Sequence, residues 1–322
     1  MMNDDYLWDR TGEPDAELAQ LERVLGTLRL APSERSLASM HPAPVLHATA
    51  RRLATAAAFM LLAGIFLIAY KLHNSGPLTS WMLSLSGAQS TPARVGQVIE
   101  TAESTRATLT SEFVGRVDIA PRSRLRLMVA TTKQQRLTLD HGSIHAFIWA
   151  PPAQFVVDTP AAKAVDLGCQ YTLQVDKHGV GLLRVEMGWV AFDWRGTESF
   201  IPAGAACRTR PGHGPDTPYF LDASPEFKHA TAEFDMNGSQ QALSTALASA
   251  RKRDALTLWH LLQRAPPNER GEVFDRLAEL VKLPPDLSRE AVLHGDRRSI
   301  DSIWNALDLG DTSWWREWKR EW

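Results

Sequence analysis

The residues of this sequence that could carry chemistry are scattered along the chain. Four histidines of its middle part lack metal-site spacing: His141, His145, His178 and His213. Further candidates lie in a region of helical pattern: His260, His294, Asp254, Asp275 and Glu279. No zinc-protease motif, nucleophile elbow or phosphate-binding glycine loop occurs. Because charged side chains on helices are more often solvated or paired than catalytic, we expect no enzyme, no bound metal and no cofactor.

Two cysteines, Cys169 and Cys207, are the only ones in the sequence, which excludes a cysteine-rich zinc module. We expect both to lie in β-strands that are neighbours. In an oxidising compartment they could form a disulfide if their Cα atoms lie within about 7 Å. Two buried free thiols are the alternative, because unpaired cysteine is a common core residue.

One apolar segment, 53–70, divides the chain, and it carries no charge. As a helix it is long enough to cross the hydrocarbon core of a bilayer. Arg51 and Arg52 precede it, whereas Lys71 alone follows at once, so we expect the N-terminus in the cytoplasm. Membrane lipid would then surround this single transmembrane helix. A core helix and a cleaved signal peptide are the alternatives.

Residues 1–30 show the pattern of a cytoplasmic amphipathic helix. Its apolar stripe consists of four leucines: Leu18, Leu21, Leu25 and Leu28. A lone helix cannot bury such a stripe on itself. Helices that lie on membranes usually carry Lys and Arg on their polar face, whereas this segment has seven acids and three arginines. We therefore expect a protein partner for these leucines, and a flexible linker at 31–52.

After a connector at 71–93, the apolar pattern has a period of two from residue 94 to 221. Many short strands without intervening helices predict an all-β domain, either a β-solenoid or a sandwich. Gly168 interrupts a strand pattern, so it would allow a β-bulge or the close approach of another backbone. The fold class is therefore multidomain, with both α and β parts.

Residues 222–322 return to a helical pattern and predict a small helical bundle or two helical hairpins. Asp254 is a possible N-cap, and Pro266 and Pro267 should end the helix that follows it. Four tryptophans of the end segment share one side of a helix: Trp314, Trp315, Trp318 and Trp322. They would dock onto the bundle, or contact a membrane interface or a partner.

The order of three motifs in the β region resembles the FecR family of bacterial regulators. The segment LDHGSIHAFIWAPPAQFVVDTP at 139–160 supplies Gly142, and VEMGWV at 185–190 supplies Gly188. Between them, VDLGCQYTLQV at 165–175 has Gly168, with Cys169 and Tyr171 where threonine and phenylalanine are usual. The likeness covers about residues 90–210.

This resemblance implies a single-pass protein of the bacterial inner membrane with its C-terminal domains outside the cytoplasm. The short N-terminus would bind an extracytoplasmic-function sigma factor, and the exported domain would receive an envelope signal. The net charge of −2 gives no case for direct contact with nucleic acid. The alternative function is an envelope protein whose β domain binds a cell-wall or surface component, without regulating a sigma factor. Another envelope protein is a further candidate partner.

Overall fold

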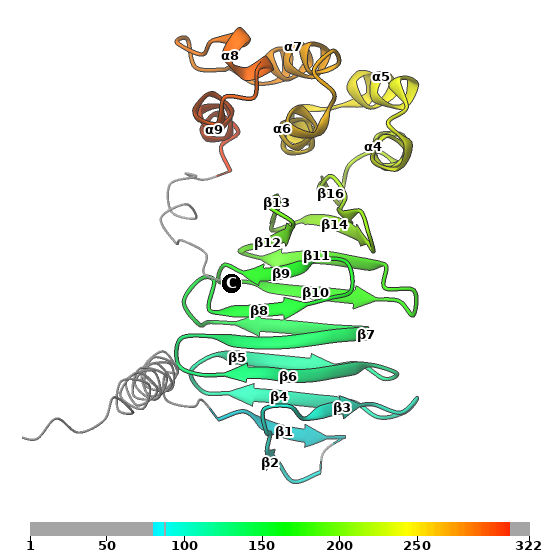
Figure 1. The fold of residues 1–322 in the computed structure, drawn as a ribbon, viewed down its shortest axis with the longest axis vertical. Coiled ribbons are helices and arrows are strands. Elements are labelled where there is room, and N and C mark those ends of the chain that lie inside the picture. Colours follow the sequence, from blue (N-terminus) through cyan, green and yellow to red (C-terminus); the bar gives the residue numbers. More distant parts are fainter. Residues whose placement is uncertain (1–79, 87, 310–322) are drawn as a thin grey trace, which may run out of the picture. The chain divides into compact units, whose positions relative to one another are not determined.

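The computed structural model describes residues 80–86 and 88–309 (Figure 1). The predicted helix at 1–30, its four leucines, the linker at 31–52 and the apolar segment 53–70 lie outside the described residues. So do the four tryptophans of the end segment. All described residues belong to one of the two compact units of the chain.

The predicted fold class needs a correction at the membrane helix. Within 80–86 and 88–309, no helix is both long enough and apolar enough to cross a membrane. The longest described helix has 13 residues, which corresponds to about 20 Å against the roughly 30 Å of a hydrocarbon core. The described structure is a large, mainly antiparallel β domain followed by helices, and it does not support the single transmembrane helix.

Sixteen strands of the described region form one hydrogen-bonded network that has two sheets. The first sheet has the order β2 (Thr91–Pro92), β1 (Met82–Leu85), β4 (Ala107–Ser111), β5 (Gly115–Ile119), β7 (Gln135–Ile148), β10 (Gln170–Val175), β11 (Gly181–Met187), β14 (Ala205–Arg210) and β15 (Gly214–Pro215); β16 (Tyr219–Phe220) also pairs with β14. The second has the order β3 (Val98–Glu100), β6 (Arg124–Ala130), β7, β8 (Phe155–Asp158), β9 (Lys163–Asp166), β12 (Trp189–Trp194) and β13 (Thr197–Pro202). Among these pairings, only the β7–β8 pair is parallel. Strands β1 and β2 lie in segment 71–93, which the sequence predicted to be a connector.

Strand β7 belongs to both sheets. Its first half pairs with β6 and β8, and its second half pairs with β5 and β10. Gly142 lies where the strand changes sheets, with a φ of +105°, and a Cβ atom there would lie 2.4 Å from the Cα of Ser123. Only glycine combines this φ with so close an approach. The antiparallel pairing fits a sandwich rather than a solenoid of parallel turns.

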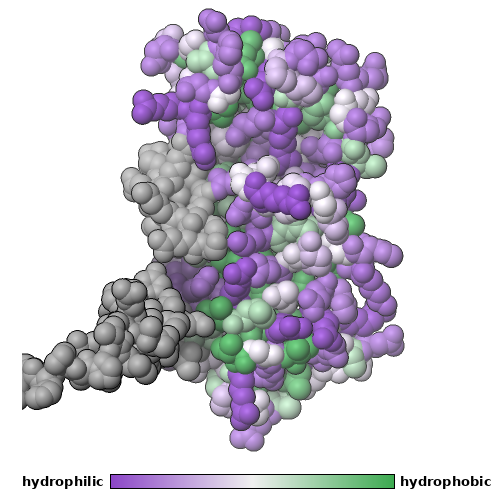
Figure 2. Space-filling view, in the orientation of Figure 1, coloured by the Kyte–Doolittle hydropathy of each residue, from purple (hydrophilic) through white to green (hydrophobic). Residues whose placement is uncertain are grey.

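The inner faces of the two sheets share one hydrophobic core. Along β10, Tyr171, Leu173 and Val175 are buried, while Thr172 and Gln174 point outward, as the alternation of the sequence predicts. Each buried aliphatic side chain of this kind contributes about 1.5–3 kcal/mol. Figure 2 shows hydrophobic side chains more often over the lower strands than over the helices.

The described helices follow the β domain. They are α4 (Pro225–Asn237), α5 (Gln240–Ser249), the short 3₁₀-helix η1 (Lys252–Asp254), α6 (Ala255–Arg264), α7 (Arg270–Leu280), α8 (Arg289–Leu293) and α9 (Arg297–Ala306). Every side chain of α6 from Ala255 to Leu262 is buried, so this is the central helix. It ends just before Pro266, as expected. Asp254 makes no capping bond to α6; it accepts hydrogen bonds from the backbone and guanidinium of Arg251.

Candidate functional site at the junction of strands and helices

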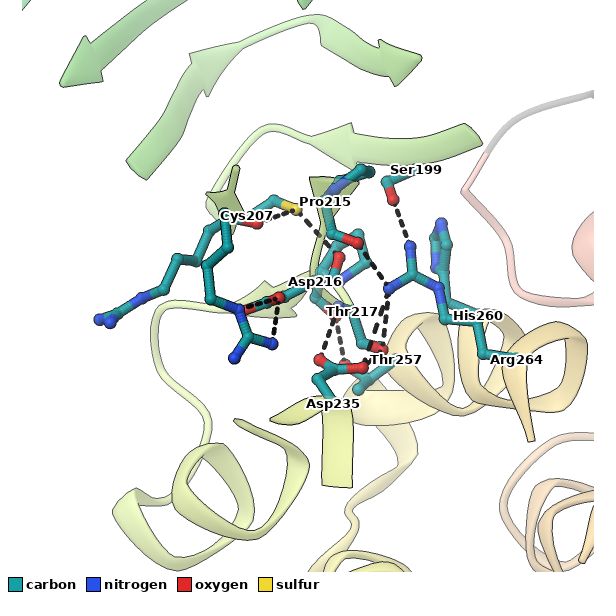
Figure 3. A network of polar contacts seen from close by, with 12 residues as sticks. Ser199, Cys207, Pro215, Asp216, Thr217, Asp235, Thr257, His260 and Arg264 are labelled. Atoms are coloured by element: carbon teal, nitrogen blue, oxygen red, sulfur yellow. Dashed lines mark hydrogen bonds and ion pairs between the residues drawn. The ribbon is translucent and has the colours of Figure 1, made fainter. Parts of the chain in front are cut away.

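Helix α6 is hydrogen-bonded to the β domain along one face (Figure 3). Thr257, His260 and Arg264 are spaced so that they share this face. The Thr257 hydroxyl donates to the carbonyl of Pro218 at 2.8 Å, and His260 Nε2 accepts the N–H of Phe200 at 3.1 Å. Arg264 donates to the carbonyl of Pro215 at 3.0 Å and to the hydroxyl of Ser199. These bonds fasten successive turns of α6 to the strands.

Asp235 of α4 is joined to Arg264 through Thr217. Its carboxylate accepts the backbone N–H and the hydroxyl of Thr217, both at 2.7 Å, and Arg264 Nη1 lies 3.8 Å from Oδ1. The Thr217 hydroxyl in turn accepts from Arg264 at 3.3 Å. Burial raises the pKa of Asp235, and the Arg264 charge opposes that rise. We call Ser199, Thr217, Asp235, Thr257, His260 and Arg264 the junction network.

A second buried carboxylate, Asp216, lies beside this network. Its Oδ1 accepts from Arg210 Nη2 at 2.7 Å, while its backbone carbonyl accepts the thiol of Cys207 at 3.1 Å. Burial first, and then repulsion from Asp235, raises the pKa of Asp216. Burial also raises the pKa of Cys207, so this side chain stays a protonated, unreactive thiol.

His260 is held as a neutral imidazole. Its Nδ1 donates to the Leu256 carbonyl at 2.9 Å, which leaves Nε2 as the acceptor for Phe200. Burial, and then the charge of Arg264, lowers the pKa of His260 to about 3. Because both ring nitrogens are engaged, His260 cannot act as a general base without breaking one of these bonds. The junction network therefore serves to hold helices and strands together.

A cavity of about 810 Å³ opens at the same junction. Its walls are mainly apolar, and they come from the strands, η1, α6, the end of α7 and the end of α9; the lining includes Trp189, Pro202, Phe220, Leu256, Val281 and Leu307. Three cations, Lys252, Arg253 and Lys282, and one acid, Asp308, also line it. This size is within the range of sites that hold small molecules or anchoring side chains.

The segment 165–175 places a second group of buried polar side chains inside the β domain. The Asp166 carboxylate, with 1% exposure, accepts the Gly168 N–H at 2.7 Å and the thiol of Cys169. Burial raises the pKa of Asp166 to about 7. The hydroxyl of the fully buried Tyr171 has no hydrogen-bond partner among the described residues.

Gly168 and Gly188 let two turns of the β domain approach each other. Both have positive φ, +86° and +73° respectively, and a Cβ on Gly188 would lie 2.0 Å from the carbonyl oxygen of Gly168. The pairing of β10 with β11 also shifts register between Gln170 and Tyr171. The close approach is therefore made at Gly188, onto the backbone of Gly168.

Of the two alternatives for Cys169 and Cys207, the structure has the second: no disulfide joins them, and both are buried free thiols. The reason is that the strands at the two cysteines are not neighbours, because β11 lies between them: Leu173 of β10 faces Leu183 of β11, which faces Cys207 of β14. Two strand spacings give about 10 Å, and the four residues from Cys169 to Leu173 add about 13 Å along the strand. This separation exceeds what a disulfide can span.

An exposed aromatic group lies on the first sheet. Phe147 and Trp149 are 41% and 48% exposed, and their ring centroids are 5.6 Å apart. Trp149 Nε1 donates to the carbonyl of Glu112 at 2.8 Å, which fixes the indole beside the β4–β5 turn. Next to Phe147, Gln170 donates to Glu186 at 2.9 Å, and His145 lies 3.2 Å from the same oxygen. A rigid aromatic surface thus adjoins a polar cluster.

Sequence reasoning missed the junction network and the cavity. One signal was available: Arg264 ends a helix in which six of the nine preceding side chains are apolar, and a charge on such a helix needs a partner. That partner, Asp235, comes from a different helix and could not be identified from spacing. Within 80–86 and 88–309, no group of three or more His, Cys, Asp or Glu could hold a metal ion.

Comparison with known proteins agrees with the resemblance in the β region. Residues 97–190 match the family model described as FecR protein. Two crystal structures, at 1.65 and 2.50 Å resolution, of a "putative anti-sigma factor" from Parabacteroides distasonis ATCC 8503 are also similar. Each shares 15% identity and a TM-score of 0.35, over 42% of this chain and 63% of that one, a likeness too weak to carry an argument. No curated protein matches. The match to the FecR family model covers the part of the β domain from β3 to the start of β12.

Proposed function

We propose that this protein is a FecR-type regulator that controls an extracytoplasmic-function sigma factor. The observation that carries the proposal is the match of residues 97–190 to the FecR family. That match points to a regulatory rather than a catalytic role. The arrangement of His260, whose two nitrogens are both engaged, is consistent with it. We further propose that the FecR domain works outside the cytoplasm, where it receives an envelope signal.

The leucine stripe of residues 1–30 is the proposed contact with the sigma factor. Burying Leu18, Leu21, Leu25 and Leu28 on a partner would contribute about 6–10 kcal/mol before the costs of ordering. Seven acids in the same segment suit a basic surface, such as one that a sigma factor offers to DNA. The junction network would help to pass on a signal, because any movement of α6 must also move the strands bonded to it.

Binding of the full-length protein to each purified alternative sigma factor of the host tests this proposal. Leu21→Asp with Leu25→Asp places two charges in the stripe and should abolish capture. The control, Ala16→Asp with Leu30→Asp, adds the same charge on the opposite side of the helix and should retain capture. Capture that survives in the stripe variant, or a wild-type protein that captures no sigma factor, contradicts the proposal.

A second candidate function is the binding of a cell-wall or surface polymer by the β domain. The observation that favours it is the exposed pair Phe147 and Trp149 beside the polar cluster of Glu186. Rigid aromatic rings next to hydrogen-bonding groups are suited to polymers with alternating apolar and polar faces. Co-sedimentation with purified cell walls should be lost in Phe147→Ala with Trp149→Ala. Equal sedimentation of that variant and the wild type would contradict this function.

A further inference from the structure

The last four described residues line the cavity at the junction. Ala306, Leu307, Asp308 and Leu309 all contribute to its wall. The chain therefore continues into residues 310–322 from the rim of a cavity that is already apolar on most sides. Any segment attached here has a high effective concentration at the cavity.

The composition of residues 310–322 matches the lining of the cavity. Trp314, Trp315 and Trp318 would supply large, rigid apolar surfaces for walls built from Trp189, Phe220 and Leu256. Glu317 and Glu321 would supply carboxylates, while the cavity presents three cations against one acid. The match is apolar at the tryptophans and electrostatic at the two glutamates alone, because Arg316, Lys319 and Arg320 balance the acids of the segment.

The cations of the cavity are placed to meet a carboxylate. Lys252 and Lys282 are exposed and lie on different elements, η1 and the segment after α7. The guanidinium of Arg253 lies 4.4 Å above the Phe220 ring and 3.5 Å from Asp222. Arg253 is thereby held at the wall, whereas the two lysines remain available to an incoming anion.

The distance from Leu309 to the tryptophans suits the size of the cavity. Trp314 follows Leu309 by five residues, which corresponds to about 8 Å in a helix and about 17 Å in an extended chain. Either length is enough for an indole to reach a cavity whose wall includes Leu309 itself. No long loop has to be closed, so the entropic cost of docking in the same chain is small.

We propose that residues 310–322 dock in this cavity of their own chain, with indole rings on the apolar wall and glutamates facing Lys252 and Lys282. The segment is then an internal competitor for any other molecule that enters the cavity. Membrane contact, a neighbouring copy and a foreign partner are the rival destinations for these tryptophans. This inference does not depend on the proposed sigma factor.

The first experiment measures the reactivity of lysines in the full-length protein. Acetylation with a water-soluble reagent, followed residue by residue by mass spectrometry, is compared with the variant Trp314→Ala, Trp315→Ala, Trp318→Ala. We expect the variant to acetylate Lys252 and Lys282 at least threefold faster. Lys133 and Lys177, which line no part of the cavity, should react at unchanged rates and serve as internal controls. Equal rates at Lys252 and Lys282 in both proteins would overturn the proposal.

The second experiment adds a fluorescent peptide of residues 310–322 to the chain ending at Leu309 and to the full-length chain. We expect anisotropy to show binding to the shortened chain and at least tenfold weaker binding to the full-length one. Lys252→Glu with Lys282→Glu should reduce binding to the shortened chain at least tenfold, whereas Lys133→Glu with Lys177→Glu should not. A peptide that binds anionic phosphatidylglycerol vesicles but not the shortened chain, or a full-length protein that dimerises only through this segment, would overturn docking within one chain.

Discussion

Arg264 is the residue whose loss should most weaken the junction of helices and strands. The change Arg264→Met keeps an unbranched apolar stem but removes every donor of the guanidinium. It takes away the cation 3.8 Å from Asp235 and the hydrogen bonds to Pro215 and Ser199. Asp235 then remains as a carboxylate whose side chain is 8% exposed and lacks its cation.

The expected cost follows from the burial of this pair. Removing one partner of a buried ion pair costs about 3–5 kcal/mol. The separation of 3.8 Å and the 17% exposure of Arg264 place the cost near the lower limit, at about 3 kcal/mol. For a protein of this size, the corresponding fall in Tm is about 6–12 °C. Asp235→Asn should cost about 1–3 kcal/mol, because the amide offers Thr217 one acceptor fewer.

Differential scanning calorimetry of both single variants and the double variant provides the measurement. Because both residues act through Thr217, the double variant should lose less stability than the two single losses together, by about 1 kcal/mol. The matched control is Arg289→Met, which breaks the exposed pair with Asp275 and should leave Tm unchanged. Equal losses in Arg264→Met and Arg289→Met, or strict additivity in the double variant, would refute the structural reasoning.

Three further predictions concern the β domain. The Asp166 pKa of about 7 is raised above the ordinary 3.8, so the native state binds the proton first and stability should fall as pH rises from 4 to 7. Over this range the wild type should lose at most about 4 kcal/mol of unfolding free energy. Asp166→Asn should make the unfolding free energy, measured by urea unfolding at several pH values, depend less on pH. The same pH dependence in the variant and the wild type would contradict the raised pKa of Asp166. Gly142→Ala should lower Tm more than Gly212→Ala, since both have positive φ but only Gly142 lies against Ser123; equal shifts would contradict a steric role. Mass spectrometry of the unfolded protein, alkylated without reductant, should find both cysteines as free thiols, and a bridged peptide would contradict the strand order.

Local patterns in the sequence accounted for the described strands and helices. Along β10, buried and exposed residues alternate in step with the apolar and polar residues of the sequence. In α6, the apolar residues that marked the helix are buried. These features depend on neighbours within one element, so periodicity reveals them. Gly168 could be singled out for the same reason, and Gly188 through the family resemblance, although their mutual approach could not be predicted.

Features that depend on distant segments could not be predicted. The placement of the two cysteines in neighbouring strands was wrong because β11 lies between β10 and β14, and sequence order says nothing of that insertion. The pairing of Asp235 with Arg264 requires α4 and α6 to meet over the β15–β16 segment. The cavity needs residues of β12, β13, β16, η1, α6 and α9, together with the segment after α7. Such arrangements arise from packing, which local propensity does not encode.

The shared strand β7 has a consequence for how the β domain comes apart. Its two halves lie in different sheets, so both sheets need this one strand to complete their hydrogen bonding. A cut at this strand would leave four neighbouring strands with unpaired edges at once, two in each sheet. We therefore expect the domain to unfold as one cooperative unit rather than as two independently folding halves.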